Sequence, residues 1–146
     1  WMTSGLFDWA ADVFLDWSHL YHCKTWWEFP HCPNIEFFAY TEMLADLEGQ
    51  MRRVANYIGV DVPEASWPRL VSACSFATVK KNPKVVTGDC IDFAFKGGAE
   101  TFINKGTNGR WKNVLSQEEL QMYRDAMERT IDPDYANWLE NGGPVE

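Results

Sequence analysis

Only one segment of the chain has the pattern of a β-strand, and this constrains the fold more than any other feature. Residues 35–40 read Ile-Glu-Phe-Phe-Ala-Tyr and follow the break at Pro33-Asn34. A single strand cannot form a sheet, because its backbone N–H and C=O groups need a neighbouring strand. The chain is therefore either an all-α protein with one extended segment or a helix-rich portion of a larger α/β protein.

The start of the sequence favours the second alternative. The chain has 146 residues and begins with Trp1, and no basic and then apolar leader precedes this residue. We therefore expect the sequence to start inside a longer protein. The strands that would pair with residues 35–40 then belong to the preceding segment.

Apolar residues elsewhere recur at the spacing of amphipathic helices. This pattern covers residues 6–28, about 42–57 and 63–73, with further helical turns over 75–81. Residues 84–100 have no clear period, so we expect a long loop there.

Ser116 and Glu119 have the spacing of a capping box, in which each residue satisfies a backbone N–H at the start of a helix. They predict a helix that begins directly after Ser116.

Aromatic residues make up 15% of the chain, and twelve of the 22 lie within residues 1–40. So dense a group must be buried, either in the chain's own core or against a partner. One alternative function follows from this: a non-catalytic helical interaction module that uses the aromatic-rich helix 6–28 as its binding surface.

The charge is distributed unevenly along the chain. The formal net charge is −8, yet residues 69–112 carry eight basic and three acidic side chains. A nucleic-acid-binding protein normally has a broad positive face, so we expect no nucleic-acid partner. A local positive segment suits a small anionic ligand, or is simply a solvated basic surface. No run approaches the roughly 18 apolar residues of a membrane span.

The four cysteines contain no Cys-x-x-Cys pair and are too few for a disulfide-rich scaffold. We interpret them as reduced thiols of a cytoplasmic protein. A zinc site is the alternative for one cluster, which consists of His19, His22, Cys23, His31 and Cys32. Its spacing matches no familiar zinc motif, so we predict no metal site.

A glycine-containing turn is the strongest candidate for a binding site. Residues 102–113 include Gly106 and Gly109, three residues apart, and the cation Lys105. Glycine lets backbone N–H groups approach an anion without a Cβ in the way. The turn is therefore a candidate phosphate site, with a basic surface turn as the alternative.

The same turn resembles a known signature. Residues 105–113, Lys-Gly-Thr-Asn-Gly-Arg-Trp-Lys-Asn, are similar to the Arg-Lys-Gly-x-x-Gly-Asp-Trp-Lys-Asn signature of sulfotransferases that use 3′-phosphoadenosine 5′-phosphosulfate. Residues 26–34 resemble the Trp-Trp-Glu…His-x-Pro-Asn segment of that family. Residues 37–43 resemble its strand ending in Tyr-Glu-Asp, and residues 74–83 resemble its Thr-Ser-Phe…Lys-Lys-Asn-Pro segment. The resemblance covers about residues 20–139 and is closest to bacterial members of the cytosolic-type family.

The resemblance implies a set of nucleotide contacts. The family's Arg-Lys-Gly stretch holds the 3′-phosphate and falls here on Asn104, Lys105 and Gly106. Asn104 lacks the bidentate guanidinium of the usual arginine. Arg110, where the family has aspartate, is a candidate to restore that charge.

The implied adenine contacts come from three parts of the sequence. They are Tyr40, Cys74, Phe76, Phe102 and Ile103. We expect Tyr40, Phe76 and Ile103 to lie close together in space.

The implied fold is the P-loop-NTPase-like α/β sulfotransferase fold, a short parallel sheet with helices on both faces. Residues 1–146 would be the helix-rich C-terminal part of a single domain and would contribute about one strand. The family's 5′-phosphosulfate loop and its catalytic histidine have no match here. The N-terminal half of the same protein is therefore an expected partner, and no catalytic residue is assigned to this chain.

The implied activity is transfer of a sulfuryl group from 3′-phosphoadenosine 5′-phosphosulfate to the hydroxyl or amine of a small acceptor. Adenosine 3′,5′-bisphosphate is the second product. This chain would supply the 3′-phosphate and adenine contacts, and we expect it to be inactive by itself.

Overall fold

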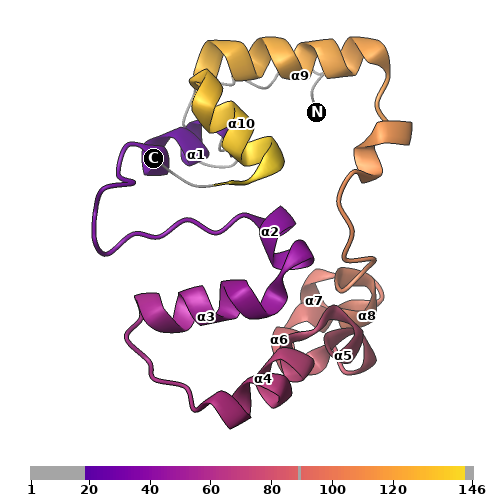
Figure 1. Cartoon of the computed structure of the whole chain (residues 1–146). Helices are drawn as coiled ribbons and strands as arrows, with labels where there is room; N and C mark the ends of the chain where they lie inside the picture. The colour runs from indigo at the N-terminus through magenta and orange to yellow at the C-terminus, as the bar shows by residue number, and fades with distance from the viewer. Residues whose placement is uncertain (1–18, 89, 144–146) are drawn as a thin grey trace. The chain divides into compact units, whose positions relative to one another are not determined.

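Short helices follow one another along residues 19–88 and 90–143, the part of the chain that the computed structural model describes (Figure 1). In chain order they are α1 His19–Trp27, α2 Tyr40–Ala45, α3 Leu47–Tyr57, the 3-10 turn η1 Glu64–Ser66, α4 Trp67–Cys74, α5 Phe76–Lys81, α6 Lys84–Thr87, α7 Ile91–Ala94, α8 Gly98–Phe102, the 3-10 turn η2 Arg110–Asn113, α9 Gln117–Thr130 and α10 Pro133–Asn141. The predicted helix 6–28 lies partly outside the described residues, and its last part is α1.

The predicted strand is wrong for this chain. Residues 35–39 form neither helix nor strand, and Tyr40 begins α2. No strand occurs anywhere in residues 19–88 and 90–143. The physical reason is that a strand exists only through its ladder of hydrogen bonds, and no segment described here offers a partner edge.

Asp46 divides the predicted helix 42–57 into α2 and α3. Its backbone leaves the helical conformation, and its side chain accepts a hydrogen bond of 2.8 Å from the backbone N–H of Gly49. An aspartate in this position satisfies one of the free N–H groups at the start of α3. The end of that helix was predicted correctly, since α3 ends at Tyr57 and Gly59 follows with a φ of 71°.

Residues 84–100 are not the long loop that the sequence predicted. They form α6, α7 and most of α8, each of which has about one turn. Lys84 and Asp92 join α6 to α7 through an ion pair of 2.7 Å. Helices this short contain too few residues to show a helical period in the sequence.

The chain divides into two compact units. One contains the described residues up to Met43 together with those from Arg110 onward, and the other contains residues 44–109.

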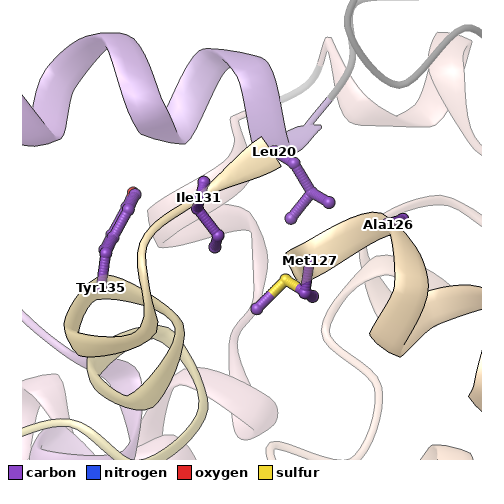
Figure 2. Packing of buried hydrophobic residues seen from close by; sticks show 5 residues of the cluster. All are labelled: Leu20, Ala126, Met127, Ile131 and Tyr135. Atoms are coloured by element: carbon purple, nitrogen blue, oxygen red, sulfur yellow. The ribbon is translucent and has the colours of Figure 1, made fainter. Parts of the chain in front are cut away.

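The first unit has its core where α1, α9 and α10 meet (Figure 2). The core side chains come from all three helices and the link between the last two: Leu20, Ala126, Met127, Ile131 and Tyr135. The predicted capping box starts α9, with the Ser116 side chain bound to the N–H of Glu119 and the Glu119 carboxylate bound to the N–H of Ser116. In this unit the structure confirms both the amphipathic spacing and the capping box.

Within the second unit, one arginine connects three helical segments. Arg52 on α3 binds Glu48 at 2.7 Å and Glu64 of η1 at 2.6 Å. Its guanidinium carbon also lies 4.4 Å from the ring centroid of Trp67, which is 5% exposed at the start of α4. Arg52 therefore connects α3, η1 and α4.

None of the helices in the described part of the chain has the length and apolar character required to cross a membrane.

Candidate functional site

Residues 104–109, which contain both glycines of the turn, lie in the second unit directly after α8. Gly106 and Gly109 both have left-handed backbone conformations, with φ of 61° and 75°. Residues with a Cβ rarely adopt this conformation, so the path of the turn depends on glycine. Lys105 is exposed beside Gly106. The turn thus combines exposed positive charge with backbone that only glycine adopts readily.

Phe76 and Gly106 lie against each other. A Cβ added at Gly106 would lie 2.5 Å from Cδ2 of the Phe76 ring, which is far too close for real contacts. The ring belongs to the first residue of α5, and 39% of the side chain remains exposed. The sequence placed both residues at one site, and the structure brings them together.

Lys80 holds the segment that enters the turn. Its ammonium group donates hydrogen bonds to the backbone carbonyls of Ile103 and, at 3.2 Å, Glu100. No role for Lys80 followed from the sequence. Its spacing of four residues from Phe76 on a predicted helix was the signal that could have identified it.

Two more predicted adenine contacts stand at the end of α8. Phe102 is its last residue, 48% exposed, and its ring packs edge-on against Phe95 with centroids 5.0 Å apart. Ile103 follows as the partly buried C-cap residue. Their backbone therefore leads directly into the candidate phosphate turn.

The remaining predicted residues are exposed. Cys74 is the last residue of α4, and Asn104 precedes Lys105 in the turn. Tyr40, 50% exposed, is the first residue of α2 and belongs to the first unit. Its expected position close to Phe76 and Ile103 therefore stays a prediction.

The His/Cys cluster contains one close pair of side chains. Sγ of Cys23 lies 3.7 Å from the ring nitrogens of His19. Within residues 19–88 and 90–143, no three His, Cys, Asp or Glu side chains gather as a metal site requires. The hydrogen bond to Cys23 raises the pKa of His19. Burial opposes ionisation of Cys23, but hydrogen bonds from His19 and Tyr135 outweigh it and lower the pKa of the thiol.

Comparison with known proteins identifies the family. The family model for the sulfotransferase domain matches residues 7–135. The chain belongs to the sulfotransferase domain family.

Several sulfotransferases are similar to the chain. Human sulfotransferase 1C2 is 31% identical over 113 residues, which cover 75% of this chain and 38% of the relative. The glycolipid sulfotransferase of Mycobacterium bovis (strain BCG / Pasteur 1173P2) is 23% identical over 123 residues, or 84% of this chain and 37% of the relative. The crystal structure of mouse sulfotransferase SULT7A1 complexed with PAP is similar in fold, with a TM-score of 0.72 and 19% sequence identity. The match covers 87% of this chain and 46% of the mouse chain.

The chain therefore spans less than half the length of these relatives. The structural match shows the sulfotransferase fold for the part that is present. With the family established, the alternative of a non-catalytic helical interaction module is not favoured.

Proposed function

We propose that this chain is the nucleotide-holding part of a sulfotransferase that uses 3′-phosphoadenosine 5′-phosphosulfate. The observation that carries the proposal is the turn at Lys105 and Gly106, in a chain of the sulfotransferase domain family. The PAP of the similar mouse structure supports the choice of nucleotide.

The turn fits a phosphate for three reasons. Gly106 has no Cβ to keep an anion away from its own N–H, and the Phe76 ring packs against it. Lys105 adds a positive charge on an exposed side chain. Charge-assisted hydrogen bonds to phosphate oxygens are stronger than neutral ones. We assign the 3′-phosphate to Lys105 and the backbone of Gly106, with Asn104 as an amide partner.

The adenine contacts are proposed for the apolar side chains near that turn. Phe76, Phe102 and Ile103 offer flat or branched apolar surface, and both phenylalanine side chains are partly exposed. Cys74 and Tyr40 complete the set by resemblance.

The reaction proposed for the whole protein is sulfuryl transfer to a hydroxyl or amine of a small acceptor. When bound, 3′-phosphoadenosine 5′-phosphosulfate supplies the sulfuryl group, whose sulfur–oxygen bond to the phosphate breaks as the bond to the acceptor forms. The acceptor's proton goes to a general base, a histidine by resemblance. We assign that base and the 5′-phosphosulfate contacts to the N-terminal half of the protein, and we expect no transfer by residues 1–146 alone. We also propose that the whole protein has a central parallel sheet with helices on both faces and is located in the cytoplasm.

The direct test is the affinity for adenosine 3′,5′-bisphosphate, measured by calorimetry. Losing a hydrogen bond to a charged group costs about 1.5–3 kcal/mol, so Lys105→Ala should weaken binding roughly tenfold or more. Lys96→Ala is the matched control, because Lys96 is an exposed lysine of the same unit outside the proposed site. Equal affinities of the Lys105 and Lys96 variants would contradict the assignment.

A further inference from the structure

One face of α5 contacts the proposed phosphate turn and the segment before it. Phe76 and Lys80 are four residues apart on α5, so their side chains project from the same face of the helix. Phe76 lies against Gly106, and Lys80 donates to the carbonyls of Glu100 and Ile103. Figure 1 shows α5 and α8 next to one another. The path from α8 into the turn is thus supported at two points.

The hydrogen bonds of Lys80 satisfy backbone carbonyls at the C-terminal end of α8. The last carbonyls of a helix lack donors from their own helix, and a lysine side chain can supply them. α8 has only five residues, and Ile103 is its C-cap. Since Lys80 holds the Ile103 carbonyl, it fixes the direction in which the backbone continues to Asn104 and Lys105.

We propose that Lys80 is a positioning residue for the nucleotide. It keeps residues 103–106 in the conformation in which Lys105 and the Gly106 N–H meet the 3′-phosphate, and it does so without touching the nucleotide. The inference rests on the proposed function. It assigns a role in nucleotide binding to Lys80, whose ammonium group binds backbone carbonyls of the protein itself.

Lys81 separates this geometric role from a general electrostatic one. It carries the same charge one residue further along α5, is exposed, and does not donate to the carbonyls of Glu100 or Ile103. Lys81→Met therefore removes an equal charge from α5 and leaves the support of the turn intact. Lys80→Arg retains a donor long enough to reach both carbonyls and should retain most of the affinity for the nucleotide with a 3′-phosphate.

The test compares two nucleotides on the 146-residue chain and on the Lys80→Met, Lys80→Arg and Lys81→Met variants. Adenosine 3′,5′-bisphosphate and adenosine 5′-phosphate differ only in the 3′-phosphate. We expect Lys80→Met to weaken the first about tenfold and to change the second no more than Lys81→Met does. Lys81→Met should weaken both only slightly, and the more highly charged bisphosphate slightly more, because it alters only the charge of the surface.

Amide hydrogen exchange tests the support of the turn without any ligand. The amides of residues 103–106 should exchange faster in Lys80→Met than in Lys81→Met. Equal exchange in the two variants overturns the inference. So does a preference for the 3′-phosphate that survives Lys80→Met. If the unaltered chain does not distinguish the two nucleotides, the proposed function itself fails, and the inference fails with it.

Discussion

The rings of Trp27 and Tyr135 are stacked, with their centroids 4.2 Å apart and their planes inclined by 8°. Trp27 is on α1 and Tyr135, only 2% exposed, is on α10. Trp27 also packs against Phe37 and Trp138 at centroid distances of 5.5 and 5.4 Å. This indole therefore joins three parts of the first unit.

Replacing Trp27 should destabilise the first unit strongly. Trp27→Ala removes the stacking and leaves a cavity beside Tyr135, and comparable truncations of large aromatic residues cost about 3–5 kcal/mol. Urea unfolding measures the change. Trp26→Ala is the matched control, because Trp26 is the preceding residue and is 48% exposed. A cost for Trp26→Ala as large as that for Trp27→Ala would contradict the role of the stacked pair.

Gly106 should tolerate alanine less well than a glycine with a similar positive φ. Gly88 has a φ of 64° and no neighbouring atom within 4 Å of an added Cβ, whereas an added Cβ at Gly106 meets the Phe76 ring. Gly88→Ala should cost about 1–3 kcal/mol for the positive φ alone. Gly106→Ala should cost clearly more, measured as the change in the free energy of unfolding.

The same measurement in a Phe76→Ala background identifies the cause. With the ring removed, the cost of Gly106→Ala should fall to that of the positive φ alone. A cost that stays the same with and without the ring would show that Phe76 does not determine the constraint.

Cys23 should react with iodoacetamide at a lower pH than an ordinary thiol, whose pKa is about 8.5. Burial opposes ionisation of Cys23, but hydrogen bonds from His19 and Tyr135 outweigh it, and the pKa of Cys23 is lowered. The pKa of Tyr123 on α9 is raised chiefly by burial, then by Glu140, with a smaller contribution from the charge of a Cys23 thiolate. His19→Asn should shift the alkylation midpoint of Cys23 to higher pH, measured by mass spectrometry with Cys74 as the internal reference. An unchanged midpoint would contradict the pairing.

The signs of the two titrations also predict how stability varies with pH. The lowered pKa of Cys23 stabilises the fold above the ordinary thiol pKa, and this contribution is lost as the pH falls through the folded value. The raised pKa of His19 contributes fully below its ordinary value of 6.5, and this contribution is lost as the pH rises through the folded value. His19→Asn should remove the His19 contribution, which thermal unfolding at pH 5 and pH 9 would measure.

Replacing Ser116 should lower the free energy of unfolding more than replacing a serine that stands at an N-cap position without a cap hydrogen bond. Ser116→Ala removes one half of the capping box of α9, and such losses cost about 1 kcal/mol. Ser66 precedes α4 as its N-cap residue but its side chain makes no cap hydrogen bond. Ser66→Ala should therefore change the unfolding free energy by a few tenths of a kcal/mol at most. Equal costs for the two substitutions would contradict the capping assignment.

The sequence predicted local features of the fold well because their causes are local. Ser116 and Glu119 carry their capping chemistry within one helical turn, and α5 coincides closely with the helix expected over residues 75–81. The strand at residues 35–40 was wrong because strand formation depends on a partner that no local pattern supplies. The short helices α6 and α7 were missed since a single turn leaves no period to detect.

The candidate site was predictable as a set of residues but not as a geometry. Lys105, Gly106 and Phe76 were all identified from the sequence, through glycine chemistry and through the family resemblance. The contact between Phe76 and Gly106 and the hydrogen bonds of Lys80 join residues far apart in the chain. Only the fold brings them together, so no pattern of spacing between Lys80 and Ile103 could have indicated the bond.

The position of Arg52 makes three helical segments depend on one another. Each of α3, η1 and α4 contributes a partner to the same guanidinium, through Glu48, Glu64 and the Trp67 ring. Loss of any one segment deprives the other two of a shared contact. Residues 47–74 should therefore open as one cooperative unit rather than fray helix by helix.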